Sequence, residues 1–363
     1  MADLSISMQR LWSQRIEGDK HAKPEEVVQW MGAMQAQNYS QALWAIGQRM
    51  QNATLSLIEK AIAEKKIIRT WPMRGTLHFI APEDIRWMLN LSAERLMSSN
   101  KGRLKQLELD EATLERCKLI FYHALKDGRP LSRPYLMKLL EESGISTQNQ
   151  RGPYILWYAS QTSQICQGPM QANQQTFALI EDWAPHAKEL SRDESLYELA
   201  KRYFLSHGPA TVHDFSWWAS LTVVDAKRGM EAAKPELAVD KLDSKEYGMA
   251  PNQMAIKNSS FQLLPGFDEY LLGYKDRSAV LSEAHTFNVI PGKNGVFLPT
   301  IVADSQIMGT WKRTPKKKTV ELILTPFASL EKKLEEKAAQ AAEAYSSFLE
   351  LPLSSLTVHE QSE

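Results

Sequence analysis

The sequence predicts an α+β protein that is mainly α-helical, in which groups of helices each end in a short β-hairpin. Two observations support this prediction: helical periodicity is followed by a hairpin pattern in successive stretches, and β-rich runs separated by turn residues begin near residue 261. At 363 residues, with 43% hydrophobic and 24% charged residues, the chain is long enough for two to four folded domains.

The first group lies at the N-terminus. Residues 67–80, IIRTWPMRGTLHFI, predict a hairpin because strand-forming residues flank the turn residues Pro72 and Gly75. Helices followed by such a hairpin make up a winged helix, in which one helix can enter a DNA groove while the hairpin, or wing, contacts the backbone. The helices that precede the hairpin are expected at about 5–15, 24–34, 39–50 and 54–66.

A second group repeats this order. Helical patterns cover 83–100 and 110–126, and Ser132 is expected to cap a further helix that Gly144 ends. Another helix follows, and residues 167–180 predict a second wing.

The third group is less complete. One helix ends at Gly208, the next begins at Thr211, and a third covers 223–234, but the hairpin pattern after it is weak. We interpret the three groups as tandem winged-helix modules.

The remainder predicts an antiparallel β-rich element, a small sheet or barrel, and a final helix that packs back onto the body. That helix carries an apolar stripe of Leu330, Leu334, Ala338, Ala341, Tyr345 and Phe348. The predicted segments are 1–82, 83–190, 191–260 and 261–363.

Two glutamines, Gln35 and Gln37, occupy the joint between the second and third helices. Asn38, with Gln41 three residues on, predicts an N-cap with a reciprocal capping partner, so the next helix begins just after the glutamines. On an extended joint, residues two apart share a side, and both amides would then lie beside the positive end of the following helix. Composition alone favours the simpler alternative, polar loop residues that bind backbone groups.

Several classes of function lack sequence support. There is no GxGxxG, GxxxxGK[ST], GxSxG or HExxH motif, and the eight histidines are scattered. Cys117 and Cys166 are far apart, so we predict buried thiols rather than a disulfide, and neither a metal site nor a cofactor is expected. The net charge of zero counts against a protein that coats a polyanion by charge alone, and the lack of a signal peptide or membrane-spanning run predicts a cytoplasmic protein.

The chain resembles the winged-helix DNA-binding family that contains the bacterial DNA glycosylases AlkZ and YcaQ. The resemblance covers nearly the whole chain and rests on four stretches: QAQ at 35–37, RTWPMRGTLHFIAPEDIRW at 69–87, LLPGFDEYLLGYKDRS at 263–278 and NGVFLPTIVADSQIMGTWKR at 294–313. It implies three tandem winged helices and a β-rich element around a DNA-binding channel. The implied activity is excision of alkylated purines, including unhooking of interstrand crosslinks in the AlkZ branch.

The resemblance also implies roles for individual residues. The AlkZ branch carries Gln-x-Gln where the YcaQ branch carries Gln-x-Asp, so Gln35 and Gln37 become the catalytic candidates. It places the 67–80 hairpin close to DNA. The hairpin residues concerned are Arg69, Trp71, Arg74, Thr76 and His78. For His78 a structural, hydrogen-bonded role is an equal alternative, and for Trp71 a core position is favoured.

The chemistry of a glutamine pair can be argued from the reaction itself. Cleavage of an N-glycosidic bond passes through a sugar with oxocarbenium character, and a neutral purine leaves poorly without protonation. A purine alkylated at N7 or N3 is already cationic, so the enzyme needs only to bind the lesion and place a water molecule near the anomeric carbon. A neutral amide can accept from that water and donate to sugar or phosphate oxygens, but it cannot act as a strong base. A glutamine pair therefore restricts hydrolysis to preactivated lesions.

Two charged groups outside the joint need an interpretation. The basic run Lys312, Arg313, Lys316, Lys317 and Lys318 is a candidate for backbone contacts with DNA, the alternative being a solvated turn. Asp268, Glu269 and Asp276 form the densest carboxylate cluster, for which we favour a structural ion-pair network over a metal site. The pair Trp217 and Trp218 is expected to fill the core of the third module.

Three classes of function remain open on the sequence. The first is a monofunctional, metal-independent DNA glycosylase that acts on damaged double-stranded DNA in the cytoplasm, associated with the nucleoid. The second is a noncatalytic winged-helix DNA-binding regulator, because a fold does not fix a function. The third is a protein-interaction scaffold, which the neutral net charge allows. Neither a membrane nor an obligatory protein partner is indicated.

Overall fold

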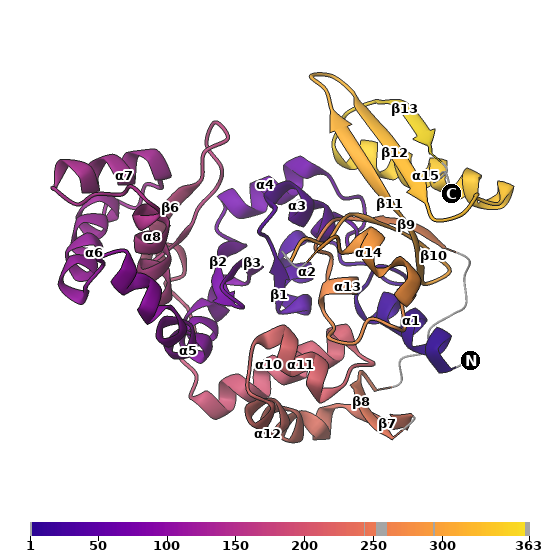
Figure 1. Ribbon diagram of the computed structural model, residues 1–363, viewed down its shortest axis with the longest axis horizontal. Helices are drawn as coiled ribbons and strands as arrows, with labels where there is room; N and C mark the ends of the chain where they lie inside the picture. Colours follow the sequence, from indigo (N-terminus) through magenta and orange to yellow (C-terminus); the bar gives the residue numbers. More distant parts are fainter. Residues whose placement is uncertain (1, 243, 252–259, 293–294, 360–363) are drawn as a thin grey trace. The chain divides into compact units, whose positions relative to one another are not determined.

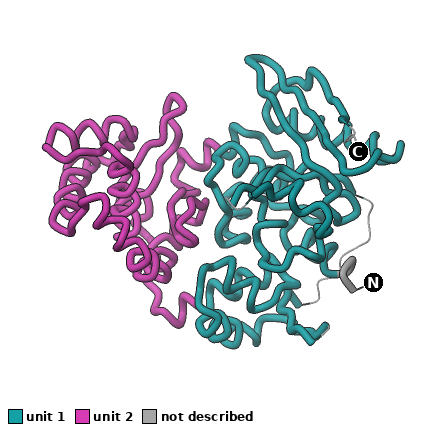
Figure 2. The backbone as a smooth tube through the Cα atoms, viewed as in Figure 1, with its two compact units in different colours: residues 1–58, 197–363 teal, residues 59–196 magenta. Residues whose placement is uncertain are grey.

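The computed structural model describes residues 2–242, 244–251, 260–292 and 295–359, and of residues 2–5 only the backbone (Figure 1). The chain is 48% helical and 20% strand, so the predicted mainly α class is confirmed. It divides into two compact units, which are described separately: unit 1 comprises residues 1–58 and 197–363, and unit 2 comprises residues 59–196 (Figure 2). The division into four segments stays a prediction. Residues 243 and 252–259 of the predicted third segment, and residue 294 at the start of the last quoted motif, lie outside the described residues.

Unit 2 packs helices against a small antiparallel sheet. The hairpin β2 (Ile68–Met73) and β3 (Thr76–Ile80) forms as predicted, and so does the second wing, β5 (Ile165–Gln167) and β6 (Thr176–Leu179). Arg69 pairs with Gln167, so the two predicted wings join in one sheet, which the short β4 (Leu131–Ser132) extends beyond β6.

The helices of unit 2 follow the predicted order and are capped where local chemistry predicts. The helices are α5 (Ile85–Gln106), α6 (Glu111–Leu125), α7 (Arg133–Glu142), α8 (Arg151–Gln161) and α9 (Ile180–Trp183), after the 3-10 turn η1 (Pro82–Asp84). The Ser132 side chain accepts from the backbone N–H of Tyr135, and Gly144 has a φ of 76°, so the predicted start and stop of α7 are confirmed. Cys117 and Phe121 lie at the centre of the core, and Trp71 packs half-buried against it.

Unit 1 contains the N-terminal helices and the third helical group. Its helices before residue 260 are α1 (Ala2–Ser13), α2 (Pro24–Met31), α3 (Tyr39–Gly47), α10 (Arg192–His207), α11 (Val212–Ala219) and α12 (Val223–Ala233), with η2 (Lys234–Glu236); α4 (Leu55–Ala63) and the start of α10 cross the unit boundaries. Thr211 caps α11 with Asp214 as its reciprocal partner. The weak hairpin pattern of the third group does form a hairpin, β7 (Ala238–Leu242) and β8 (Lys245–Met249).

The C-terminal element is a five-stranded sheet in the order β13-β12-β11-β10-β9. Its strands are β9 (Phe261–Leu264), β10 (Thr300–Ala303), β11 (Gln306–Pro315), β12 (Val320–Pro326) and β13 (Leu353–Val358). Four strands pair antiparallel, as predicted, while β13 adds to the edge in parallel with β12 and was not predicted. Short helical segments, α13 (Glu269–Leu272), η3 (Glu283–His285) and α14 (Thr286–Val289), lie between β9 and β10 in the chain.

The final helix, α15 (Lys332–Phe348), packs back onto unit 1, as predicted. Tyr345 and Phe348 place their rings 5.0 and 4.8 Å from Trp44 of α3, and Tyr345 also meets Trp311 of β11 at 5.0 Å. The buried stripe is turned slightly from the prediction, because Ala342 rather than Ala341 is fully buried. This aromatic cluster fixes α3, the helix that begins directly after the two glutamines.

Both cysteines are free and fully buried, which confirms their prediction as small buried residues. Burial raises the pKa of Cys117 to about 11 and that of Cys166 to about 12, so neither thiol is a nucleophile at neutral pH.

Candidate active site

The joint that carries the glutamines is extended as far as Gln35, but Gln37 lies in a bend before α3, so the extended joint predicted for both glutamines forms only in part. Helix α2 ends at Met31, three residues before the predicted end, because Gly32 adopts a φ of 75°. Residues Ala33–Gln35 then form the short strand β1, and Asn38 caps α3. The side-chain oxygen of Asn38 accepts from the backbone N–H of Gln41 at 3.3 Å, which confirms the predicted N-cap.

The predicted reciprocal half of this cap is wrong. The Oε1 atom of Gln41 instead accepts from the backbone N–H of Gly266 at 3.1 Å. The Gln41 side chain therefore binds a backbone N–H that is distant in sequence, and not the backbone of Asn38 as the local pattern predicted. As a result, the loop that leads into α13 is tied to the first turn of α3.

The two glutamines occupy different environments. The Gln35 side chain is only 9% exposed, whereas Gln37 is exposed. The Oε1 atom of Gln35 is buried and has no hydrogen-bond partner among the residues that the structure describes. Because an unpaired buried acceptor costs free energy, this oxygen does not fit the simpler alternative of a loop amide that binds backbone groups.

A buried carboxylate lies directly behind the backbone of Gln35. The backbone N–H of Gln35 donates to Oε1 of Glu269 at 3.0 Å, and the indole N–H of Trp218 donates to Oε2 at 2.9 Å. Nε2 of His207 lies 3.7 Å from Oε2, and the side chains of Glu269 and His207 are 1% and 0% exposed. The ion-pair network predicted for Glu269 does not include its bond to the Gln35 backbone; the only sequence signal for Glu269 is its position in LLPGFDEYLLGYKDRS.

The other two carboxylates of the predicted cluster, Asp268 and Asp276, form separate ion pairs. Asp268 forms a buried two-pronged ion pair with Arg49, with both N–O distances at 2.9 Å, as the ion-pair interpretation predicts. Asp276 is half-exposed and pairs with Lys245 at 3.0 Å. Among the described residues no group of three His, Cys, Asp or Glu side chains could hold a metal ion.

Aromatic side chains wall in the Glu269 carboxylate. Tyr203 stacks on His207 with ring centroids 4.8 Å apart and lies 4.9 Å from Trp218. Burial raises the pKa of Tyr203 well above its usual value, so it stays a neutral phenol that donates to the backbone oxygen of Gly273 at 2.8 Å. Trp218 fills the core, as predicted, whereas Trp217 is half-buried with the Arg277 guanidinium 4.9 Å above its ring.

Comparison with known proteins decides the family. The family described as "DNA glycosylase AlkZ-like" matches residues 28–348. The chain belongs to this AlkZ-like DNA glycosylase family. A relative from Streptomyces sahachiroi, named "Interstrand DNA cross-link repair glycosylase", is 25% identical over 370 residues, which cover 92% of this chain and 94% of that protein. The solved structure of Streptomyces sahachiroi DNA glycosylase AlkZ is similar in fold, with a TM-score of 0.81, 23% identity and 98% of each chain covered.

Family membership confirms the predicted resemblance and the predicted class of enzyme, a DNA glycosylase. It favours an activity on DNA over the regulator and scaffold alternatives. Among the helices that the structure describes, none is both long and apolar enough to span a bilayer.

The hairpin that the family resemblance places near DNA is a tight turn in unit 2. Arg74 and Gly75 occupy the turn with φ values of 54° and 66°, so Pro72 is not the turn residue that the sequence suggested. It lies in β2, where the pairing register shifts, since a residue without an N–H fits an irregular position. The DNA-binding roles of this hairpin stay a prediction.

Individual hairpin side chains make internal contacts. His78 is fully buried; its Nδ1 lies 2.9 Å from the backbone oxygen of Thr76, and its Nε2 lies 2.9 Å from Nη2 of Arg74. This geometry is the structural, hydrogen-bonded alternative that the sequence allowed. Arg69 is 3% exposed, whereas Arg74 and Thr76 are half-buried.

The basic run divides between a strand and a turn of unit 1. Lys312 and Arg313 belong to β11 rather than to a loop, and the exposed residues Lys316–Lys318 form the turn that leads into β12. The guanidinium of Arg313 donates to the hydroxyls of Ser40 in α3 and Tyr345 in α15, and Lys316 pairs with Glu321. Arg313 thus places a cation on the first turn of α3, three residues from Gln37.

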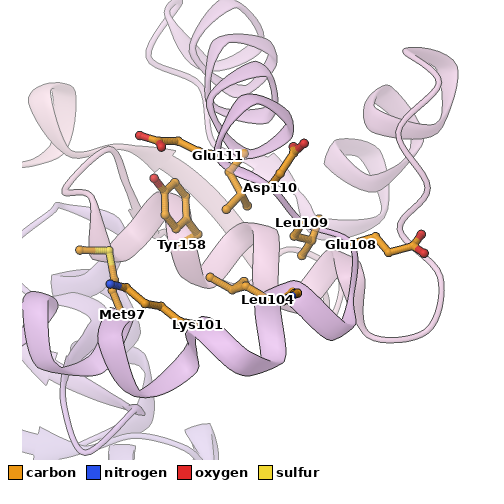
Figure 3. A pocket seen from close by; sticks show the side chains of 10 residues that line it. Met97, Lys101, Leu104, Glu108, Leu109, Asp110, Glu111 and Tyr158 are labelled. Atoms are coloured by element: carbon orange, nitrogen blue, oxygen red, sulfur yellow. The ribbon is translucent and has the colours of Figure 1, made fainter.

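A separate hollow in unit 2 has no part in this site. It has a volume of about 600 Å³, with Leu104, Leu109 and Tyr158 on its apolar side and Lys101 and Glu111 at its edges (Figure 3). None of the predicted catalytic or DNA-binding residues lines it.

Proposed function

We propose that this chain is a monofunctional, metal-independent DNA glycosylase that hydrolyses the N-glycosidic bond of cationic N7- or N3-alkylated purines in double-stranded DNA. We further propose that it unhooks interstrand crosslinks built from such adducts, which the name of the Streptomyces sahachiroi relative supports. Its expected place of action is the nucleoid DNA of the cytoplasm, with no obligatory protein partner.

The observation that carries the proposal is the buried Oε1 atom of Gln35, which has no hydrogen-bond partner in the described part of the chain. It is an acceptor held at an extended joint, directly before the N-terminus of α3, where the helix dipole is positive. In the structure this oxygen is closed to solvent, so the Gln35 side chain must turn before a water molecule can donate to it. That water would then be oriented for attack without being deprotonated in advance. The exposed Gln37, two residues on, is then the amide that donates to water, sugar or phosphate.

The leaving group supplies the remaining driving force. Departure of a cationic purine neutralises its charge, so the amide pair needs neither a general acid nor a strong base. Normal purines, which require protonation, are left intact. The Glu269 carboxylate is occupied by the N–H groups of Gln35 and Trp218, which argues against its use as the hydrolytic base.

One positive side chain beside the first turn of α3, and others on the same hairpin, suit a polyanionic substrate. Arg313 contacts the first turn of α3, and Lys312 and Lys316–Lys318 are exposed on the same hairpin. Such cations position a protein on phosphates without reading bases. In unit 2, the half-buried Arg74 and Thr76 remain the proposed DNA contacts of the β2–β3 hairpin, whereas the buried Arg69 and His78 would support the hairpin from within.

The test is base release from defined DNA. The full chain is incubated with a duplex that carries one N7-methylguanine, and abasic sites are revealed by alkaline cleavage. We expect release from this duplex in the presence of a chelator and none from the same duplex with unmodified guanine. A duplex with an N7-linked interstrand crosslink should yield separated strands. Salt-dependent DNA binding without any base release would instead favour a noncatalytic regulator.

A further inference from the structure

We propose that Glu269 is a positioning residue, which acts through the backbone of Gln35 to hold the catalytic amide in place. The inference rests on the proposed function, because it assumes that Gln35 orients water. Its basis is the buried hydrogen bond from the Gln35 N–H to Oε1 of Glu269 at 3.0 Å.

The Glu269 carboxylate anchors the joint from outside the joint's own segment. Strand β1 is only three residues long and follows a glycine with positive φ, and the N–H of its last residue, Gln35, donates to this distant side chain. A hydrogen bond to a carboxylate in a dry site is stronger than one to a neutral acceptor. Such a bond at the very residue that carries the catalytic amide limits the freedom of the Gln35 backbone.

Glu269 is itself held from several sides. Trp218 donates to its second carboxylate oxygen at 2.9 Å, and Nε2 of Gln14 donates to its backbone oxygen at 3.2 Å. The preceding residue, Asp268, caps α13 and is clamped by Arg49, whose Nη2 also donates to Oε1 of Gln14 at 2.7 Å. The carboxylate is therefore a fixed point, and the position of Gln35 is defined relative to it.

This arrangement explains why a carboxylate lies in a site whose chemistry does not need one. Both of its oxygens accept from protein N–H groups, so it holds the site together and leaves the attacking water to Gln35. Effective catalysis by orientation tolerates displacements of only about 0.5 Å. A looser Gln35 should therefore lower the rate of bond cleavage without weakening DNA binding.

The experiment measures single-turnover release of N7-methylguanine by the full chain over a range of enzyme concentrations. The plateau rate reports catalysis, and the half-saturating concentration reports DNA binding. The variants are Glu269→Met, which removes both acceptors at similar volume, and Glu269→Gln, which keeps one acceptor. The matched control is Tyr270→Phe, because this neighbouring buried hydroxyl donates to the backbone oxygen of Ser305 at 2.7 Å and takes no part in the hydrogen bond between Gln35 and Glu269.

We expect the plateau rate to fall at least tenfold in Glu269→Met and to recover partly in Glu269→Gln, with half-saturating concentrations within twofold of wild type. Tyr270→Phe should change neither quantity by more than twofold. Faster hydrogen exchange at the Gln35 amide in Glu269→Met gives a readout that does not depend on activity. If Glu269→Met does not fold, the plateau of Glu269→Gln decides the question, and it should still lie below that of Tyr270→Phe.

Two results would overturn the inference. One is a plateau rate in the folded Glu269 variants equal to that of Tyr270→Phe while wild type is active. The other is a loss confined to the half-saturating concentration, because positioning of a catalytic amide acts on the plateau. If wild type itself releases no base, the proposed function fails, and this inference fails with it.

Discussion

Replacement of Gln35 by methionine should stabilise the protein while it abolishes the activity. The Gln35 side chain is 9% exposed, and its buried Oε1 has no partner in the described structure. An unsatisfied buried polar group costs about 1–3 kcal/mol, whereas an apolar side chain of similar volume avoids that cost. Gln35→Met should therefore raise the free energy of unfolding by about 1 kcal/mol, or on the order of 2–4 °C in melting temperature.

The matched control is Gln48→Met in the same unit. Gln48 is 5% exposed, and its Nε2 donates to the backbone oxygen of Leu263 at 3.0 Å. Its loss should cost about 0.5–1.5 kcal/mol, since Trp44 still satisfies that carbonyl at 2.7 Å. Urea unfolding of both variants and of wild type measures the difference. If Gln35→Met is destabilised as much as Gln48→Met, the Gln35 oxygen has a structural hydrogen-bond partner. It is then not an acceptor available to a water molecule, and the reasoning is refuted.

Three further predictions concern unit 1. Exchange of Lys317 and Lys318 for glutamine should reduce the slope of log K against log salt for DNA binding by about 1–2, and an unchanged slope would make this turn a surface feature only. Asp268→Asn should cost about 3–5 kcal/mol in urea unfolding, because its guanidinium partner stays buried and unpaired; a cost below about 1 kcal/mol would contradict this. The hydrogen bond from Ser278 lowers the pKa of Asp276 from 3.8 to about 2, so its carboxylate stabilises the fold above pH 4, and this contribution disappears as the pH falls toward 2. The stability difference between wild type and Asp276→Asn should shrink over that interval, and a constant difference would show that the carboxylate is not involved.

Local features of this fold are predictable from the sequence because their causes are local. Ser132 and Thr211 accept from N–H groups three residues ahead, and Gly144 supplies the left-handed backbone that ends a helix. The two wings follow from strand-forming residues around turn residues. Strand β13 is different: it contains two serines and depends on the neighbouring β12 for its pairing, so no pattern of its own marks it.

The candidate site is only half predictable for the same reason. Gln35 and Gln37 stand out as polar residues between apolar helices, and a family motif points to them. Glu269 lies 234 positions away from Gln35, and no periodicity connects the two. Gln41 shows the same limit, because its side chain accepts from the backbone of Gly266, which is 225 positions distant, and not from the nearby Asn38. Long-range hydrogen bonds are chosen by tertiary packing, which local spacing does not encode.

The most direct test of the account is the single-turnover rate at which wild type and Gln37→Ala release N7-methylguanine from duplex DNA at saturating enzyme. We predict that the variant still binds DNA with wild-type affinity but releases the base at least tenfold more slowly, because one of the two amides that orient water is gone. Equal rates for the two proteins would contradict it and would remove the glutamine pair from the chemistry.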